Sequence, residues 1–111
     1  MLTITPESLH DRMSQARVQL IDVRSPAEYA RSHAKGARNV PLEQLSLAAL
    51  GGIDVTLPIY LICKSGMRSH MGVRMLHSQG VNSAINVSGG TDGWRMAGLP
   101  VESTGASVLV G

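Results

Sequence analysis

The segment 58–62, Pro-Ile-Tyr-Leu-Ile, is apolar apart from the Tyr60 hydroxyl. A short run of this kind predicts a strand buried on both faces, as in the middle of a parallel sheet. Strands are also predicted at 18–23, 36–40 and 84–87, and helices at about 6–15, 26–32, 43–50 and 69–79, with a short helix around Trp94. Strands that alternate with helices at these spacings predict an α/β fold, in which a parallel sheet carries helices on its faces.

The composition of the 111 residues is that of one globular domain, with 43% hydrophobic and 16% charged residues. These fractions exclude a disordered chain and a coiled coil. Aromatic residues make up only 3%, so the core is expected to be aliphatic, with six Met filling its gaps. A protein that stacks nucleic-acid bases on aromatic side chains is therefore not expected. Ten Lys and Arg against eight Asp and Glu give a formal charge of +2, which suits a small anionic substrate as well as nucleic acid, although the sequence has no dense basic block.

The chain has one cysteine, Cys63. One cysteine excludes a disulfide within the chain and a zinc site built from several cysteines, and a lone thiol is most at home in a reducing compartment. The N-terminus lacks the pattern of a signal peptide, and no apolar run approaches the roughly 18 residues of a membrane span. We therefore expect a cytoplasmic protein with no membrane contact, no nucleic-acid partner, no cofactor and no metal ion.

Cys63 directly follows the buried strand and begins the loop Cys-Lys-Ser-Gly-Met-Arg, which ends at Arg68. A curled loop points successive backbone N–H groups at the sulfur, and the helix that follows adds the positive end of its dipole. Lys64 and Arg68 add two full positive charges, and Gly66 permits a tight bend. These features favour thiolate over thiol, so the loop predicts a lowered pKa for Cys63 and a nucleophilic role.

The opposing interpretation is that Cys63 is an inert buried residue, which is the commoner case for a lone cysteine. A cysteine that only packs would not require Lys, Gly and Arg immediately after it. Functional sites of parallel sheets form at the carboxyl ends of strands. Cys63 lies at one such end, and Asp22 and Arg24 lie close to another. The sequence therefore favours a functional cysteine.

The chain resembles the single-domain rhodaneses, the thiosulfate sulfurtransferase family, over roughly residues 1–101. The matching stretches follow the family's order and spacing: 20–24, 28–29, 33–37, 39–42, 60–69, 86–90, 93–94 and 98–101. The resemblance implies a rhodanese-like fold with five mainly parallel strands and helices on both faces. It also implies a thiosulfate:cyanide sulfurtransferase in which Cys63 carries the sulfur as a persulfide. We expect a domain at 1–101, followed by a tail at 102–111 that is flexible or begins a continuation.

The resemblance also implies roles for the residues near Cys63. The loop is expected to bind the donor, with two cations holding the sulfonate of thiosulfate and the backbone stabilising the terminal sulfur. Asp22 is expected to hold the loop, and Arg24 is expected to form a buried ion pair with Glu28 that supports the site. The acceptor, cyanide or a thiol that could belong to a protein, must come from outside the chain. The expected donor-binding residues are Lys64, Ser65, Gly66, Met67, Arg68 and Ser69.

Two alternative functions remain open. A dual-specificity phosphatase family shares this fold and also uses a loop cysteine and arginine. Its signature places five residues between the two, whereas four separate Cys63 from Arg68, and the loop here lacks the phosphatase's acidic residue. The other alternative is a non-catalytic module, or a relay that hands sulfur to a protein partner. Non-catalytic modules commonly lose the loop cysteine, which this chain keeps.

Three further patterns concern core packing and metal binding. Trp94 is expected to anchor the core. Met67, Met71 and Met75 recur every four residues, which predicts that they pack in the core, although Met67 lies inside the loop and is expected to shape its entrance. The histidines at 70 and 77 share a helix face but have no third ligand at metal spacing, so we expect no metal site there.

Overall fold

A computed structural model describes residues 2–104. Its main sheet has five parallel strands in the order β1-β6-β5-β2-β4, which confirms the predicted fold class. These strands are β1 (Thr3–Ile4), β2 (Gln19–Asp22), β4 (Arg38–Asn39), β5 (Ile59–Ile62) and β6 (Ala84–Val87). The helices are α1 (Pro6–Met13), α2 (Pro26–Arg31), α3 (Met67–Ser78), α4 (Gly90–Met96) and the short 3₁₀ helix η1 (Leu42–Gln44). A separate antiparallel pair is formed by β3 (His33–Ala34) and β7 (Val101–Glu102).

The starts of α1 and α2 agree with the local sequence. The Thr5 side chain accepts a hydrogen bond from the Ser8 N–H at 3.2 Å, ahead of a proline in the first turn of α1. At α2, Ser25 and Glu28 form a capping box, in which each side chain accepts a hydrogen bond from the other residue's backbone N–H. Such caps are typically worth about 1 kcal/mol each.

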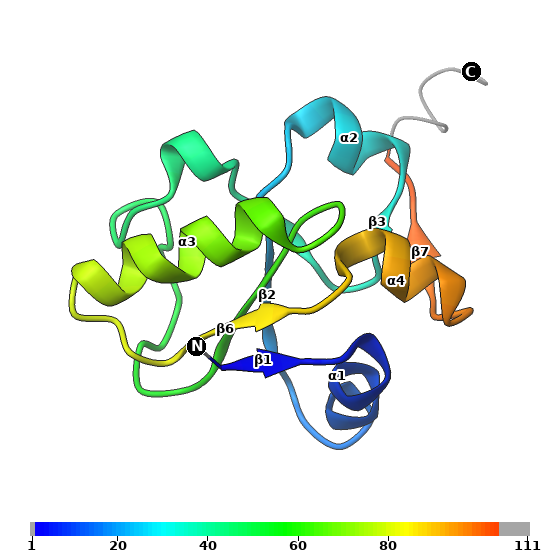
Figure 1. Cartoon of the computed structure of the whole chain (residues 1–111), viewed down its shortest axis with the longest axis horizontal. Coiled ribbons are helices and arrows are strands. Elements are labelled where there is room, and N and C mark those ends of the chain that lie inside the picture. The colour runs from blue at the N-terminus through cyan, green and yellow to red at the C-terminus, as the bar shows by residue number, and fades with distance from the viewer. Residues whose placement is uncertain (1, 105–111) are drawn as a thin grey trace.

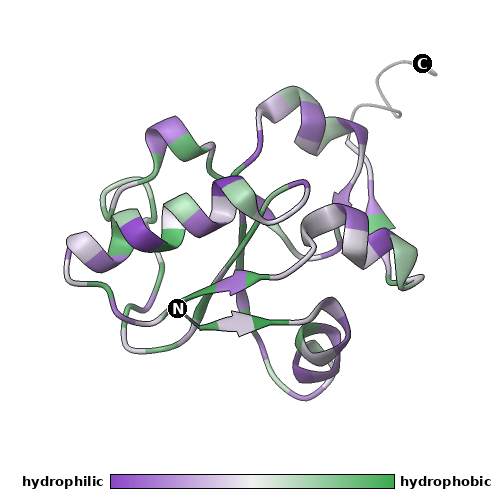
Figure 2. Cartoon of the chain, viewed as in Figure 1, coloured by the Kyte–Doolittle hydropathy of each residue, from purple (hydrophilic) through white to green (hydrophobic). Residues whose placement is uncertain are grey.

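The core has two halves, one on each face of the sheet. Successive residues of β5 alternate between them: Leu61 faces α3, whereas Tyr60 and Ile62 face the other side. The half beneath α3 is completed by aliphatic residues of that helix, and the other half contains the fully buried Trp94, as expected. Figure 1 shows α3 and α1 on opposite sides of the sheet, and Figure 2 shows apolar residues concentrated along the central strands. Each buried aliphatic side chain contributes about 1.5–3 kcal/mol.

The helix predicted at 43–50 is wrong. Only η1 (Leu42–Gln44) is helical, and Leu45 adopts an extended conformation that ends it. The chain then turns so that Leu45 and Leu50 both reach the core beneath α3. The Arg38 guanidinium binds the carbonyl oxygens of Ala49 and Gly51, and this bonding holds the turn that replaces the expected helix. Strands β1, β3 and β7 were not predicted, because two residues are too few to show alternation.

The predicted core packing is wrong for Met71, is confirmed for Met75, and was not expected for Met67, which lies at the loop entrance. Met67 and Met71 are 78% and 57% exposed, and only Met75 packs against the core. The helix turns Gly72 and its neighbour Val73 toward the sheet instead. A Cβ at Gly72 would lie 2.9 Å from Leu61 Cδ1, so the helix approaches the sheet closely at this position.

The C-terminal segment is described as far as Thr104. Glu102 belongs to β7, and the Ser103 hydroxyl donates to the Ala30 carbonyl at 3.0 Å. The remainder of the tail expected at 102–111 lies outside the described residues, so the division at 101 stays a prediction. None of the described helices has the length and apolar character needed to cross a membrane.

Candidate active site

Cys63 lies where β5 ends, at the carboxyl edge of the sheet. The loop that follows bends at Gly66, whose φ of +110° places it in the left-handed region that favours glycine. Helix α3 begins at Met67, so the start of the helix lies over the loop, slightly earlier than the predicted start at 69. The Cys63 side chain is almost fully buried, with 1% of the residue exposed. The sulfur is therefore held by the loop rather than presented on the surface.

The Cys63 sulfur accepts hydrogen bonds from several donors of its own loop. The Gly66 N–H lies 3.0 Å from the sulfur and the Ser69 hydroxyl lies 3.3 Å from it. Burial on its own raises the pKa of the thiol. The Ser69 hydroxyl and the backbone N–H groups of Ser69, Gly66 and Ser65 outweigh burial, so the pKa of Cys63 lies below its ordinary value. The geometry thus supports the predicted thiolate and identifies which loop residues stabilise it.

Arg68 forms an ion pair with Glu28 of α2. Its two terminal nitrogens bind the two carboxylate oxygens at 2.7 and 3.0 Å, in a bidentate arrangement. The hydrogen bond to Arg68 is the main reason that the pKa of Glu28 falls to about 2. The same bond raises the pKa of Arg68, and the negative charges of Glu28 and Cys63 raise it further. Arg68 therefore links α2 to the loop while its charge acts on the sulfur.

Helix α4 supports the loop from the other side. The Thr91 N–H and hydroxyl donate to the Cys63 carbonyl at 2.7 and 2.9 Å, and the Asp92 N–H donates to the Lys64 carbonyl at 3.0 Å. The Lys64 ammonium group also binds the Asp92 carboxylate at 2.8 Å. Gly90 makes this approach possible, because a Cβ there would lie 2.5 Å from the Lys64 carbonyl group. Backbone contacts from α4 therefore fix the first two residues of the loop.

The expected ion pair between Arg24 and Glu28 is wrong. Arg24 binds Asp22, two residues before it, with its side-chain nitrogens 2.8–3.1 Å from the carboxylate oxygens. A further nitrogen of Arg24 donates to the Ser32 carbonyl at 2.7 Å. Asp22 is fully buried with its carboxylate bound by Arg24, and its charge acts on Arg68 of the loop, so its expected hold on that loop stays a prediction. The two residues form a buried pair that joins β2 to the end of α2.

Sequence reasoning missed three residues that contact the loop. The Asn86 amide donates to the Gly66 carbonyl at 3.3 Å, and its oxygen lies 2.5 Å from the Ser69 hydroxyl, where it competes with the sulfur for that hydroxyl's one proton. Thr91 and Asp92, which bind the backbone of the loop, are the other two missed residues. The adjacent strands β5 and β6 end at the same edge, and Gly89-Gly90 follows β6. A closer interpretation of that pattern could have placed α4 beside the loop.

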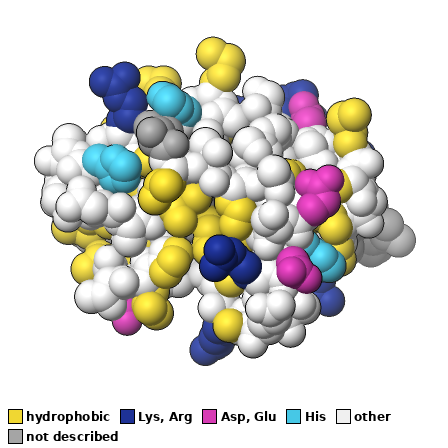
Figure 3. All heavy atoms as spheres, turned by 60° about the horizontal axis from the view of Figure 1, so that its bottom comes forward, with side chains coloured by type: hydrophobic (Ala, Val, Ile, Leu, Met, Phe, Trp, Pro, Cys, Tyr) yellow, Lys and Arg dark blue, Asp and Glu magenta, His cyan; other side chains and the backbone are white. Residues whose placement is uncertain are grey.

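A hollow of about 200 Å³ lies beside the loop, between α2 and α4. A larger one, of about 400 Å³, lies at the amino ends of the strands, against Arg17, Val18 and Leu57. Figure 3 views the molecule with the bottom of Figure 1 forward and shows hydrophobic side chains gathered on that face. Because Cys63 lies at the opposite ends of the strands, only the smaller hollow adjoins it. Within residues 2–104, no three His, Cys, Asp or Glu side chains are close enough to bind a metal ion together.

The fold and the loop together define an α/β protein with one activated thiol at the carboxyl end of a central strand. Residues 5–97 match the family model of the rhodanese-like domain. The chain therefore belongs to the rhodanese-like sulfurtransferase family and has the family's active-site cysteine, Cys63.

Relatives and solved structures agree with this assignment. The chain is 31% identical over 100 residues to the thiosulfate sulfurtransferase GlpE of Actinobacillus pleuropneumoniae, covering 90% of this chain and 92% of that protein. It is 35% identical over 103 residues to an uncharacterized Synechocystis protein, covering 93% of this chain and spanning 57% of that relative's length. The solution structure of a rhodanese-like domain from Anabaena superposes with a TM-score of 0.85 at 24% identity, covering 96% of this chain and 83% of that one, which shows the shared fold.

Proposed function

We propose that this protein transfers sulfane sulfur from thiosulfate, or from a persulfide donor, to cyanide or a thiol through a persulfide on Cys63. The observation that carries the proposal is the Cys63 sulfur at the end of β5, with the Gly66 N–H 3.0 Å and the Ser69 hydroxyl 3.3 Å away, donors that lower the pKa of its thiol. Relatives that match along nearly their whole length are thiosulfate sulfurtransferases by name, which supports thiosulfate as the donor.

In the first step, the Cys63 thiolate attacks the outer sulfur of thiosulfate. A bond forms between Cys63 Sγ and that sulfur, and the S–S bond of thiosulfate breaks, with its electron pair leaving on sulfite. In the second step, the acceptor attacks the outer sulfur of the persulfide, and the electron pair of the broken bond returns to Cys63. No external oxidant or reductant is needed. A reducing compartment such as the cytoplasm would keep Cys63 available as a thiol.

The loop residues would serve this reaction in two ways. The N–H groups of Ser65, Gly66 and Ser69, which lower the pKa of the thiol, would also stabilise the charged outer sulfur of the persulfide. Lys64 and Arg68 would attract the sulfonate of the donor, and Met67 would lie at the entrance, because its side chain is exposed at the start of α3. The pair of Asp22 with Arg24 and the carboxylate of Glu28 would support the site from β2 and α2.

The test is intact-protein mass spectrometry of the reduced chain after incubation with thiosulfate, followed by cyanide. We expect the mass of one added sulfur atom, lost again with cyanide, and no gain in Cys63→Ser. A double variant, Cys63→Ser with Ser78→Cys, moves the thiol to the exposed end of α3 and serves as the matched control. Persulfide formation by that variant at the wild-type rate would show that the loop is unimportant. No gain by the wild type would refute the proposal and make phosphatase activity the next assay.

A further inference from the structure

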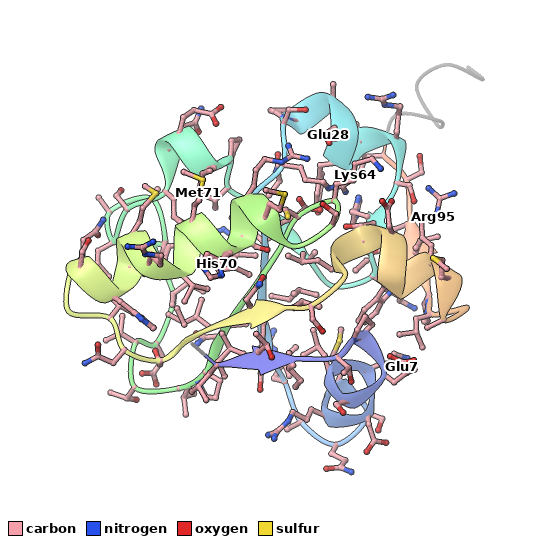
Figure 4. The ribbon with its side chains drawn as sticks, viewed as in Figure 1. Glu7, Glu28, Lys64, His70, Met71 and Arg95 are labelled. Atoms are coloured by element: carbon pink, nitrogen blue, oxygen red, sulfur yellow. The ribbon has the colours of Figure 1, made fainter. Side chains whose placement is uncertain are left out.

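The hollow beside the loop is lined by four cationic and two acidic side chains. Figure 4 shows Lys64 between Glu28 on α2 and Arg95 on α4. The residues around the hollow come from three separate segments of the chain: 24–32, Lys64 of the loop, and 91–95 of α4. The lining residues are Arg24, Glu28, Arg31, Ser32, Lys64, Thr91, Asp92 and Arg95.

Most of these charges are already matched. Arg24 is bound by Asp22, and Glu28 is bound by Arg68, and neither partner lines the hollow. Lys64 is matched by Asp92 at 2.8 Å. Each of these cations therefore has a carboxylate partner.

Arg31 and Arg95 differ from the other cations of the hollow. Among the described residues neither forms an ion pair, and the only side-chain hydrogen bond of Arg31 is a long one of 3.4 Å, from its Nε to the Ala27 carbonyl. Both residues are exposed, one in the last turn of α2 and one in the last turn of α4. Two guanidinium groups thus border one hollow with their charge uncompensated. A guanidinium fork matches the geometry of a carboxylate.

The hollow is also linked directly to the sulfur's own segment. Thr91, which lines the hollow, binds the Cys63 carbonyl, and Lys64 is the next residue along the chain. A molecule whose anionic group lies between α2 and α4 therefore occupies the wall of the loop that holds Cys63. An acceptor that contacts both the loop and the ends of the two helices must be longer than cyanide.

We propose that Arg31 and Arg95 bind the carboxylate of a small thiol that accepts the sulfur from Cys63. This inference rests on the proposed function and specifies its acceptor. The acceptor thiolate attacks the outer sulfur of the Cys63 persulfide, so that a new S–S bond forms on the acceptor. The bond between that sulfur and Cys63 Sγ breaks, and its electron pair restores the thiolate. The product is a persulfide of the carboxylate-bearing thiol.

The experiment follows the second half-reaction alone. The protein is first loaded with sulfur from thiosulfate, freed of donor and mixed with one of three short thiols: 3-mercaptopropionate, 2-mercaptoethanol or cysteamine. Loss of the added sulfur is followed by intact-protein mass spectrometry, and rates are expressed per thiolate. We expect the anionic thiol to react about tenfold faster than the neutral one, equivalent to a binding difference of about 1.4 kcal/mol, and the cationic thiol to be slowest.

Variants test whether the preference for the anionic thiol arises at Arg31 and Arg95. The double variant Arg31→Gln with Arg95→Gln should lose most of the advantage of 3-mercaptopropionate and leave the rate with 2-mercaptoethanol unchanged. The double variant Arg12→Gln with Arg74→Gln removes two exposed arginines, from α1 and α3 and outside the hollow, and serves as the matched control. Equal rates for the three thiols in a normally loaded wild type would overturn the acceptor site and leave sulfur transfer intact. An equal loss in the control variant would overturn it as well, because it would indicate attraction by the net charge. A wild type that takes up no sulfur would overturn both proposals.

Discussion

Gly90→Ala should destabilise the protein far more than a comparable substitution at an unobstructed glycine. An added Cβ at Gly90 would lie 2.5 Å from the carbonyl carbon and oxygen of Lys64 and 2.6 Å from the Cys63 carbonyl oxygen. All three are backbone atoms, so no flexible side chain can move aside. Helix α4 must then retreat from the loop and weaken the hydrogen bonds that Thr91 and Asp92 donate to it.

The size of the effect follows from two contributions. A residue with a Cβ at the φ of +59° found at Gly90 costs about 1 kcal/mol. The two backbone hydrogen bonds from α4 to the loop contribute about 1 kcal/mol each. We therefore expect Gly90→Ala to lower the free energy of unfolding by about 3 kcal/mol. Gly98 has a similar φ of +73° with no neighbouring atom within 4 Å, so Gly98→Ala should cost only about 1 kcal/mol.

Urea unfolding of the wild type and both variants measures the two costs. In a separate thermal unfolding experiment, the midpoint should fall by roughly 12–24 °C for Gly90→Ala and by roughly 4–8 °C for Gly98→Ala, at the roughly 4–8 °C per kcal/mol that is typical of domains near this size. In Gly90→Ala the loop should also hold its sulfur less firmly, so the reactivity of Cys63 toward iodoacetamide should change, whereas Gly98→Ala should leave it unchanged. Equal destabilisation by the two variants would show that contact between α4 and the loop contributes little.

Two further predictions concern titrating groups. Ser69→Ala removes the hydroxyl that donates to the sulfur, so the pKa of Cys63 should rise and the iodoacetamide rate profile should move to higher pH; an unchanged profile would contradict this assignment. Glu28→Gln keeps a side chain that can complete the capping box but removes the charge that Arg68 binds, so it should cost about 1 kcal/mol at pH 7 in this partly exposed pair. Because the pKa of Glu28 is lowered from 4.5 to about 2, that difference is fully present above pH 4.5 and disappears as the pH falls through 2. Urea unfolding at pH 7 and pH 3 checks this, with the exposed Glu43→Gln as the control; a difference that persists undiminished at low pH would refute the role of the ion pair.

The local sequence predicted those elements whose signals lie within a few residues. The apolar segment at 58–62 predicted β5, and the helices predicted at 6–15 and 26–32 correspond to α1 and α2, whose first turns are capped by Thr5 and Ser25. The loop of Cys63 could also be predicted, because its glycine, its cations and the helix after it follow one another along the chain. The helix expected at 43–50 failed because Leu45 and Leu50 are placed by a core beneath α3 that the local pattern does not reveal.

Pairings between distant residues were not predictable in the same way. The family resemblance suggested that Arg24 binds Glu28, whereas the partner of Glu28 is Arg68, which only the fold brings near. Arg24 binds Asp22 instead, because both residues lie at the end of β2. The contacts of α4 with the loop were missed for the same reason, since they join segments that are separated along the chain and adjacent in space.

The pairing of β1 with β6 has a consequence for how the domain is made. Thr3 of β1 is aligned with Asn86 of β6, a strand that follows much later along the chain. A ribosome therefore releases β1 long before β6, its neighbour in the described sheet, has been made. Folding during synthesis can complete this edge only after β6 has emerged from the ribosome, and pairings between such distant residues form slowly. Until then, β1 remains without its partner strand.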